Sequence, residues 1–245
     1  MSQTRPRTKA AADAERRSAA ASRRWPLIAA LVGVGLVAVL GAAIAYRGSN
    51  LPLAFDTEWM NEILDSRHPA LEVPAQIMDA VGGHLIGIVL VPVAIIVVLC
   101  FLRRFWAALY FTVATVLSAG LVQLLKGIFD RPRPEDILVV ADIGSFPSGH
   151  VANAATMAVV IGFIAERTWV WAAGVAYTLL MMLSRTYLGA HWVSDTVGGL
   201  VLGAAVAVIV WAPFAHRMHR EHESRRAIAA SERVRRNSAA REHAT

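Results

Sequence analysis

Six long apolar stretches constrain the fold of this chain more than any other feature of its sequence. Each is close to the roughly 20 apolar residues that a helix needs to cross a lipid bilayer. Of the 245 residues, 56% are hydrophobic and only 17% are charged, whereas a soluble domain has about 25% charged residues. The chain is therefore predicted to be an all-α polytopic membrane protein, with six transmembrane helices in a bundle. The stretches are Pro26–Tyr46, Val81–Leu102, Phe105–Leu125, Ser148–Ala165, Trp169–Leu188 and Val193–Phe214.

The connections between the stretches differ in length. Arg103-Arg104 alone separates the second stretch from the third, and residues 166–168 alone separate the fourth from the fifth. Turns this short join helices into antiparallel hairpins. Before the second stretch, Asp56–Ser66 is compatible with a short amphipathic helix in the outer membrane interface, with Asp56 as its N-cap. A plain surface loop is the alternative.

Basic residues are distributed unevenly along the chain. Seven lie in the N-terminal tail, residues 1–25, and eight in the C-terminal tail, residues 215–245. With both tails inside, eighteen of the 24 Lys and Arg residues are cytoplasmic, as the positive-inside rule requires. We therefore predict cytoplasmic N- and C-termini, disordered tails and one membrane domain, residues 26–214. The net charge of +6 thus reflects membrane topology rather than nucleic-acid binding.

The first stretch has a second interpretation, as a cleaved signal peptide. Ala43-Ile44-Ala45 resembles a cleavage site. The length of the apolar stretch and of its basic lead-in favours a retained helix.

Three short motifs contain most of the residues capable of chemistry. The first follows the third stretch, the second begins the fourth, and the third joins the fifth to the sixth. Since the third and fifth stretches end outside and the fourth and sixth begin there, all three motifs should meet at the outer face. Their residues are Lys126, Arg133 and Pro134; Pro147, Ser148, Gly149 and His150; and Ser184, Arg185, His191 and Asp195.

The cationic residues of these motifs predict an anion site. Lys126, Arg133 and Arg185 repel one another unless an anion lies between them, and a guanidinium group matches phosphate oxygens. Ser148-Gly149 opens a helix, where the helix dipole and backbone N–H groups attract the same anion. A metal held by the two histidines and an aspartate is the rival interpretation. Three adjacent cations oppose a dication, so no metal and no cofactor are expected.

The two histidines suit two different chemical roles. His191 and Asp195 are four residues apart and therefore share one helix face. A carboxylate on one imidazole nitrogen fixes the tautomer and presents the other nitrogen as a nucleophile or base. His150 is left to protonate the leaving oxygen. Less specific candidates, which either shape the pocket mouth or simply solvate the loop, are His84, Asp130, Arg131, Glu135, Asp136 and Asp142.

These motifs resemble the signature of the type 2 phosphatidic acid phosphatase superfamily. Its pattern is Lys-x6-Arg-Pro, then Pro-Ser-Gly-His, then Ser-Arg-x5-His-x3-Asp, and this sequence matches every position between Lys126 and Asp195. The resemblance implies that His191 is a nucleophile that forms a phosphohistidine, with Asp195 assisting and His150 as general acid. It also implies that five residues bind the phosphoryl group: Lys126, Arg133, Arg185, Ser148 and Gly149.

The resemblance further implies a bacterial inner (plasma) membrane enzyme that hydrolyses a lipid phosphomonoester or pyrophosphate. Undecaprenyl pyrophosphate is the favoured substrate, because its head group is released at the outer leaflet. The expected partners are the membrane and a lipid-phosphate substrate that enters from the bilayer, with no nucleic acid and no obligate protein partner. A phosphatidylglycerophosphate or phosphatidate phosphatase is the first alternative. A vanadate-dependent haloperoxidase-like enzyme and a non-catalytic lipid-binding membrane protein are less favoured.

Overall fold

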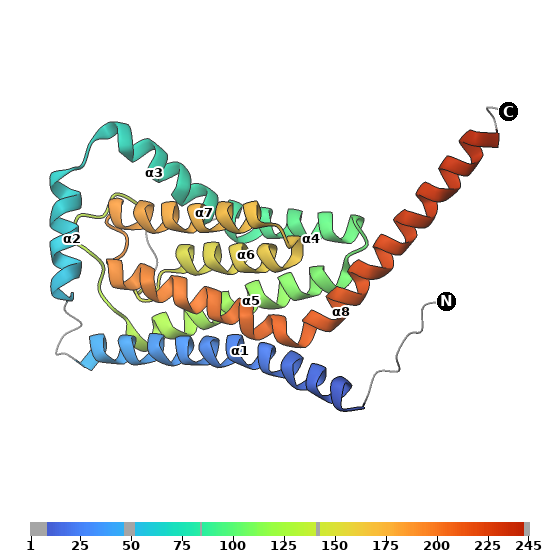
Figure 1. Cartoon of the computed structure of the whole chain (residues 1–245). Coiled ribbons are helices and arrows are strands. Elements are labelled where there is room, and N and C mark those ends of the chain that lie inside the picture. The colour runs from blue at the N-terminus through green and yellow to red at the C-terminus, as the bar shows by residue number, and fades with distance from the viewer. Residues whose placement is uncertain (1–8, 47–51, 84, 141–142, 243–245) are drawn as a thin grey trace.

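The computed structural model describes residues 9–46, 52–83, 85–140 and 143–242. Every regular element in this part of the chain is a helix (Figure 1), which confirms the all-α prediction. The elements in chain order are α1 (Lys9–Tyr46), α2 (Ala54–Asp65), α3 (Pro69–Gly82), the π-helix η1 (Ile86–Leu90), α4 (Val91–Phe101), α5 (Phe105–Phe129), α6 (Gly149–Ala165), α7 (Thr168–Tyr187) and α8 (Val193–Glu242).

Several of these helices are long and apolar enough to cross a membrane. Among the described residues, three meet this condition: Arg24–Tyr46 in α1, all of α5, and Val193–Glu223 in α8. A fourth span results if α3 and the segment Ile86–Phe101, which are bent by 43° relative to each other, are counted as one. α6 is apolar but has only 17 residues. The predicted count of six spans is therefore not confirmed and stays a prediction.

The largest difference from the sequence prediction lies in the second apolar stretch, Val81–Leu102. The sequence predicts one helix there, whereas α3 ends at Gly82 and η1 begins only at Ile86. Gly83 has extended backbone angles, φ −131° and ψ −159°, which end the helix. Two consecutive glycines lose the most backbone entropy on entering a helix, and this cost explains the break. α3 consequently leaves the bundle at an angle and packs against α7 (Figure 1).

α2 lies across one end of the bundle, at a steep angle to the long helices (Figure 1). Of the two alternatives for Asp56–Ser66, a short helix and a surface loop, the structure has the helix, α2. Asp56 is not its N-cap, however. The N-cap is Leu53, whose backbone N–H donates to the Asp56 carboxylate at 3.2 Å. The Asp56 side chain is fully buried, and its charge is compensated by an ion pair with Arg131, on the loop after α5.

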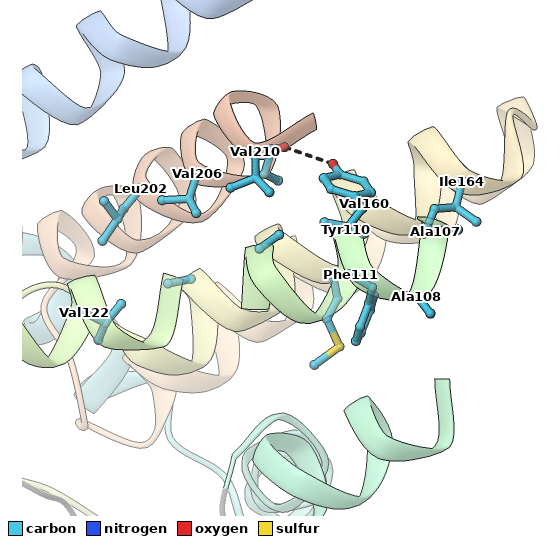
Figure 2. Packing of buried hydrophobic residues seen from close by; sticks show 14 of the residues in the cluster. Ala107, Ala108, Tyr110, Phe111, Val122, Val160, Ile164, Leu202, Val206 and Val210 are labelled. Carbon is cyan, nitrogen blue, oxygen red and sulfur yellow. Dashed lines mark hydrogen bonds between the residues drawn. The ribbon is translucent and has the colours of Figure 1, made fainter. Parts of the chain in front are cut away.

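α6 is the central helix of the bundle and packs against α5, α7 and α8. Glycine on α8 permits a close approach of α8 to the start of α6, since a Cβ at Gly199 would overlap the backbone carbonyl oxygen of Ser148. Figure 2 shows the apolar side chains packed among these helices, where the Tyr110 hydroxyl of α5 donates to the Ala207 carbonyl oxygen of α8 at 2.9 Å. The beginnings of α6 and α8 are therefore held at a fixed separation.

Helix extends from the bundle into both tails, for which disorder was predicted. Residues 9–24 continue α1 as helix, and residues 215–242 continue α8. Both segments are rich in Ala and Arg, which have high helix propensity. Each extends an existing helix and so avoids the cost of nucleation. The start of α1 and the end of α8 lie at the end of the molecule opposite α2 (Figure 1), an arrangement compatible with both tails on one side of the membrane.

Candidate active site

The motif residues come together at the end of the bundle where α2 lies. Four of the helices supply them at this end: α5 by its last turn and the loop that follows, α6 and α8 by their first turns, and α7 by its last turn and the turn after it. A cavity of about 660 Å³ opens among them. The motif residues that line it are Lys126, Gly149, His150, Arg185 and His191. The sequence-based expectation that the three motifs converge is met by the geometry.

His191 lies in the turn between α7 and α8 and is almost completely buried. Its Nδ1 lies 2.8 Å from the backbone carbonyl oxygen of Ser145, whereas the Asp195 Oδ2 is 3.7 Å away. The hydrogen-bond partner expected from the sequence was Asp195. Because a carbonyl oxygen only accepts, the contact with Ser145 places the proton on Nδ1 and leaves the lone pair on Nε2. A backbone carbonyl thus performs the tautomer control assigned to the carboxylate.

The Nε2 of His191 faces the cationic part of the site. The Arg133 Nη1 lies 3.4 Å from it. Burial lowers the pKa of His191 well below 6.5, and the positive charges of Arg185, Arg133 and Lys126 lower it further. His191 is therefore neutral at physiological pH, the state in which Nε2 can attack an electrophile.

Two backbone carbonyl groups hold the guanidinium of Arg133 in place. Its Nη1 donates to the Ala190 oxygen at 2.6 Å and its Nη2 to the Gly144 oxygen at 2.9 Å. Neither of these two partners is charged. The two contacts orient the guanidinium toward His191, where it can meet an anion.

Ser148 presents a buried hydroxyl at the start of α6. The residue is fully buried, and its Oγ has no hydrogen-bond partner among the described residues. An unpaired buried hydroxyl costs about 1–3 kcal/mol, which an anion oxygen would recover. The Ser148 backbone N–H, which was expected to face the anion, instead donates to the Asp195 carbonyl oxygen at 3.0 Å. Of the two Ser148 donors, the side chain is the one left for a ligand.

Sequence reasoning gave Arg131 no specific role, yet it is the centre of a buried ion-pair network. Its Nη1 lies 2.5 Å from the Asp195 carboxylate and its Nη2 lies 2.8 Å from that of Asp56, with all three side chains fully buried. Asp56 also accepts the Ser194 N–H at 2.8 Å, and the second Asp195 oxygen accepts the Trp192 N–H at 2.9 Å. Asp195 therefore anchors the start of α8 and connects it to α2.

The network around His150 also contains a residue that sequence reasoning missed. The sequence motifs contain no carboxylate partner for His150, but its Nε2 lies 3.1 Å from the Asp79 Oδ1. The same carboxylate oxygen contacts the Arg185 Nη1. Asp79 comes from the last turn of α3, a helix that contains none of the motifs. An ionisable residue in an apolar helix is a signal that would have identified it.

The remaining sequence candidates have structural roles or lie apart. The Ser184 hydroxyl donates to the Ala75 carbonyl oxygen at 2.7 Å and so joins α7 to α3. Pro134 and Pro147 are buried in the loop between α5 and α6. Asp130 ends α5 with a left-handed backbone, φ 37°, and the exposed Glu135 and Asp136 lie on the following loop. His84 and Asp142 lie outside the described residues.

Away from the histidines the cavity has an apolar wall. Residues of η1, α4 and α5 form it, and small residues at the end of α3 complete it. The apolar residues at this wall are Ile88, Pro92, Ile96, Val116, Ala119 and Val122. One cavity therefore joins a cationic, histidine-containing end to a hydrophobic groove between helices.

Comparison with known proteins identifies relatives with this architecture. A family model described as the PAP2 superfamily matches residues 107–218. The crystal structure of Aquifex aeolicus LpxE is 30% identical in sequence and has a TM-score of 0.57, covering 64% of this chain and 95% of that chain. This chain belongs to the PAP2 superfamily.

Two further proteins are similar to it. The structure of a transmembrane PAP2-type phosphatidylglycerolphosphate phosphatase from Bacillus subtilis has a TM-score of 0.65 at 26% identity, covering 74% of this chain and 93% of that one. Undecaprenyl-diphosphatase of Sulfolobus acidocaldarius is 32% identical over 79 residues, which are 32% of this chain and 34% of the relative. The chain spans between 34% and 59% of the length of three curated relatives that it matches.

The PAP2 match also separates two groups of site residues. All the motif residues lie within the matched segment 107–218, as does Arg131. Asp56 and Asp79 lie before it. The carboxylates that α2 and α3 supply to the site are therefore additions from outside the matched segment.

Proposed function

We propose that this protein is a lipid phosphatase that works through a phosphohistidine without a metal ion. The observation that carries the proposal is one cavity in which His191, Lys126 and Arg185 lie at one end and an apolar wall lies at the other. Such a cavity suits a substrate with an anionic phosphate head and a hydrocarbon chain, because each part meets the environment that it prefers.

The first chemical step is an attack by the His191 Nε2 on phosphorus. A bond forms between nitrogen and phosphorus, and the bond from phosphorus to the leaving oxygen breaks. His150 gives its proton to that oxygen, so the lipid product leaves with one fewer negative charge than it would without protonation. Lys126, Arg133, Arg185 and the Ser148 hydroxyl stabilise the charge on the phosphoryl oxygens.

The second step returns the enzyme to its starting state. His150 takes a proton from water, the water oxygen attacks the phosphohistidine, and the nitrogen–phosphorus bond breaks. Inorganic phosphate leaves, His191 recovers its lone pair, and His150 is protonated again. Atoms and protons balance over the two steps, and the chain's own residues suffice for both.

Undecaprenyl pyrophosphate is the substrate that we favour, with the active site on the outer face of the bacterial inner membrane. The likeness to an undecaprenyl-diphosphatase supports it. The likeness in fold to a phosphatidylglycerolphosphate phosphatase supports the alternative, a phosphatidylglycerophosphate or phosphatidate substrate.

A competition assay on purified protein in detergent tests both levels of the proposal. Release of para-nitrophenolate from para-nitrophenyl phosphate reports the basic activity, and undecaprenyl pyrophosphate, phosphatidylglycerophosphate and phosphatidate compete with this ester. Inhibition at the lowest concentration by undecaprenyl pyrophosphate is expected, and stronger inhibition by a glycerolipid would select the alternative. An inactive enzyme that forms no acid-labile phosphoprotein would refute the proposal itself.

A further inference from the structure

The last turn of α3 places a carboxylate between two groups of the active site. Asp79 is 6% exposed. Its Oδ1 lies 3.1 Å from the His150 Nε2 and also contacts the Arg185 Nη1. Its backbone carbonyl oxygen lies 3.2 Å from the same His150 nitrogen. One residue of α3 thus makes contacts with both α6 and α7.

The helix break after α3 is what allows this contact. A Cβ at Gly83 would overlap the imidazole ring of His150, and one at Gly82 would overlap the Met181 side chain of α7. The backbone at residue 83 can therefore lie against His150 only if this residue is glycine. The break between α3 and η1 places the last turn of α3 beside His150, so that both the carbonyl oxygen and the carboxylate of Asp79 reach the imidazole ring.

α6 also fixes the far side of the break. The Asn153 Nδ2 donates to the Gly82 carbonyl oxygen at 3.3 Å and to the Gly87 carbonyl oxygen at 3.1 Å. Asn153 lies three residues after His150, so both side chains project from the same face of α6. The ring of His150 and the end of α3 are consequently held to each other from two sides.

The charges near His150 explain what a carboxylate contributes there. Arg185 contacts the same Asp79 oxygen, and Lys126 and His191 line the same cavity. These neighbours are cationic or neutral, and they disfavour a positive charge on the imidazole ring. A general acid needs that charge, because the proton it donates must be on the ring when the leaving oxygen departs.

We propose that Asp79 is a positioning residue for the general acid: it pairs with the imidazolium of His150 and orients the ring toward the leaving oxygen. Its contact with Arg185 also aligns that guanidinium for the phosphoryl group. This inference rests on the proposed function, in which His150 protonates the leaving group. It extends the site to α3, a helix outside the segment that matches the PAP2 model.

The leaving group distinguishes this role from a purely structural one. A para-nitrophenolate leaves with little protonation, whereas an alkyl alkoxide requires it. Asp79→Asn should therefore lower kcat on a long-chain alkyl phosphate by about tenfold to a hundredfold, a part of the 10²–10⁴-fold that general acid catalysis supplies. On para-nitrophenyl phosphate kcat should fall no more than about threefold. KM should rise for both esters through Arg185, since both carry the same phosphoryl group.

Two further variants complete the experiment. Glu72→Gln changes a carboxylate on the same helix, α3, and should leave kcat on both esters unchanged. Asp79→Glu keeps the charge on a longer side chain and should restore part of the loss on the alkyl ester. It also serves as the test if Asp79→Asn does not fold, and it should then reduce turnover of the alkyl ester more than that of the aryl ester.

The inference would be overturned by equal losses of kcat on the two esters, or by no loss on either. Failure of the proposed function gives a different result: the wild-type protein would release phosphate from neither ester and form no phosphoenzyme. If the wild-type enzyme is active and the Asp79 variant loses kcat equally on both esters, the role of Asp79 is refuted and the proposed phosphatase function is not.

Discussion

Replacement of Arg131 by methionine tests the buried network that connects α2 to Asp195. Both Nη atoms of Arg131 are in ion pairs, at 2.5 Å with Asp195 and 2.8 Å with Asp56, and the three side chains have no exposed surface. Methionine has a similar length but leaves two buried carboxylates without a cation. Removing one partner of a buried ion pair costs about 3–5 kcal/mol, because the remaining charge cannot be solvated.

This cost should be measurable as a change in thermal unfolding of the protein in detergent. For a chain of this size 1 kcal/mol corresponds to roughly 2–4 °C, so Arg131→Met should lower Tm by roughly 6–20 °C. Arg67→Met is the matched control. Arg67 donates to the backbone oxygen of Asp136 at 2.7 Å and pairs with no carboxylate in the described network, so its loss should cost about 0.5–1.5 kcal/mol.

A double variant shows whether the cost comes from the unpaired charge. Asp56→Asn removes one of the two carboxylates, so Arg131→Met combined with Asp56→Asn should lose less stability than the two single changes added together. A Tm decrease for Arg131→Met no larger than that for Arg67→Met would refute the reasoning. Strict additivity of the two single changes would refute it as well.

Four other predictions concern the reaction and the topology. His191→Ala should abolish turnover and the trappable phosphoenzyme, and a phosphoenzyme that survives the change would exclude His191 as nucleophile. Since the pKa of His191 lies well below 6.5, the neutral nucleophile persists as pH falls. The acid limb of kcat/KM, corrected for substrate ionisation, should therefore lie below pH 6.5, and a limb at or above that pH contradicts the assignment. Activity should survive exhaustive EDTA treatment and be inhibited by vanadate; activity lost in EDTA and restored by a divalent ion would contradict the metal-free site. A cysteine at Asp136 should react with an impermeant thiol reagent from outside the cell and one at Arg220 should not, and the reverse pattern would invert the topology.

The sequence was most informative where chemistry depends on residue type at fixed spacing. Lys126, Ser148, His150, Arg185 and His191 could be selected from the motifs, and their convergence followed from hydropathy and charge. The long helices α1 and α5 to α8, and α4, followed from the apolar stretches. α3 did not, because Pro69–Gly82 lies almost entirely before the second stretch, Val81–Leu102. The backbone entropy cost of two glycines, Gly82 and Gly83, ends the helix there. A hydropathy average over about 20 residues does not detect a cost confined to two of them.

The unpredicted contacts are of two kinds. The acceptor for His191 is the backbone oxygen of Ser145, and every residue has such an oxygen, so no residue type indicates it. Asp79 and Asp56 act on the site from helices far away in sequence, and their partners depend on how α2 and α3 fold over the bundle. Asp79 was missed, although its position as an acid between the apolar residues Met78 and Ala80 could have identified it.

The close seam between α6 and α8 has a consequence for how the protein can vary. At Gly199 and Gly203 even a methyl group would overlap the main chain of α6, at Ser148 and Ala152 respectively. The distance between the hydroxyl of Ser148 and the first turn of α8 is therefore set by contact of one backbone with another rather than by the size of side chains. Lipid-facing residues can be exchanged for other apolar ones as the surrounding bilayer changes, and this distance remains the same. The geometry of the active site should therefore depend little on the thickness and lipid composition of the surrounding bilayer.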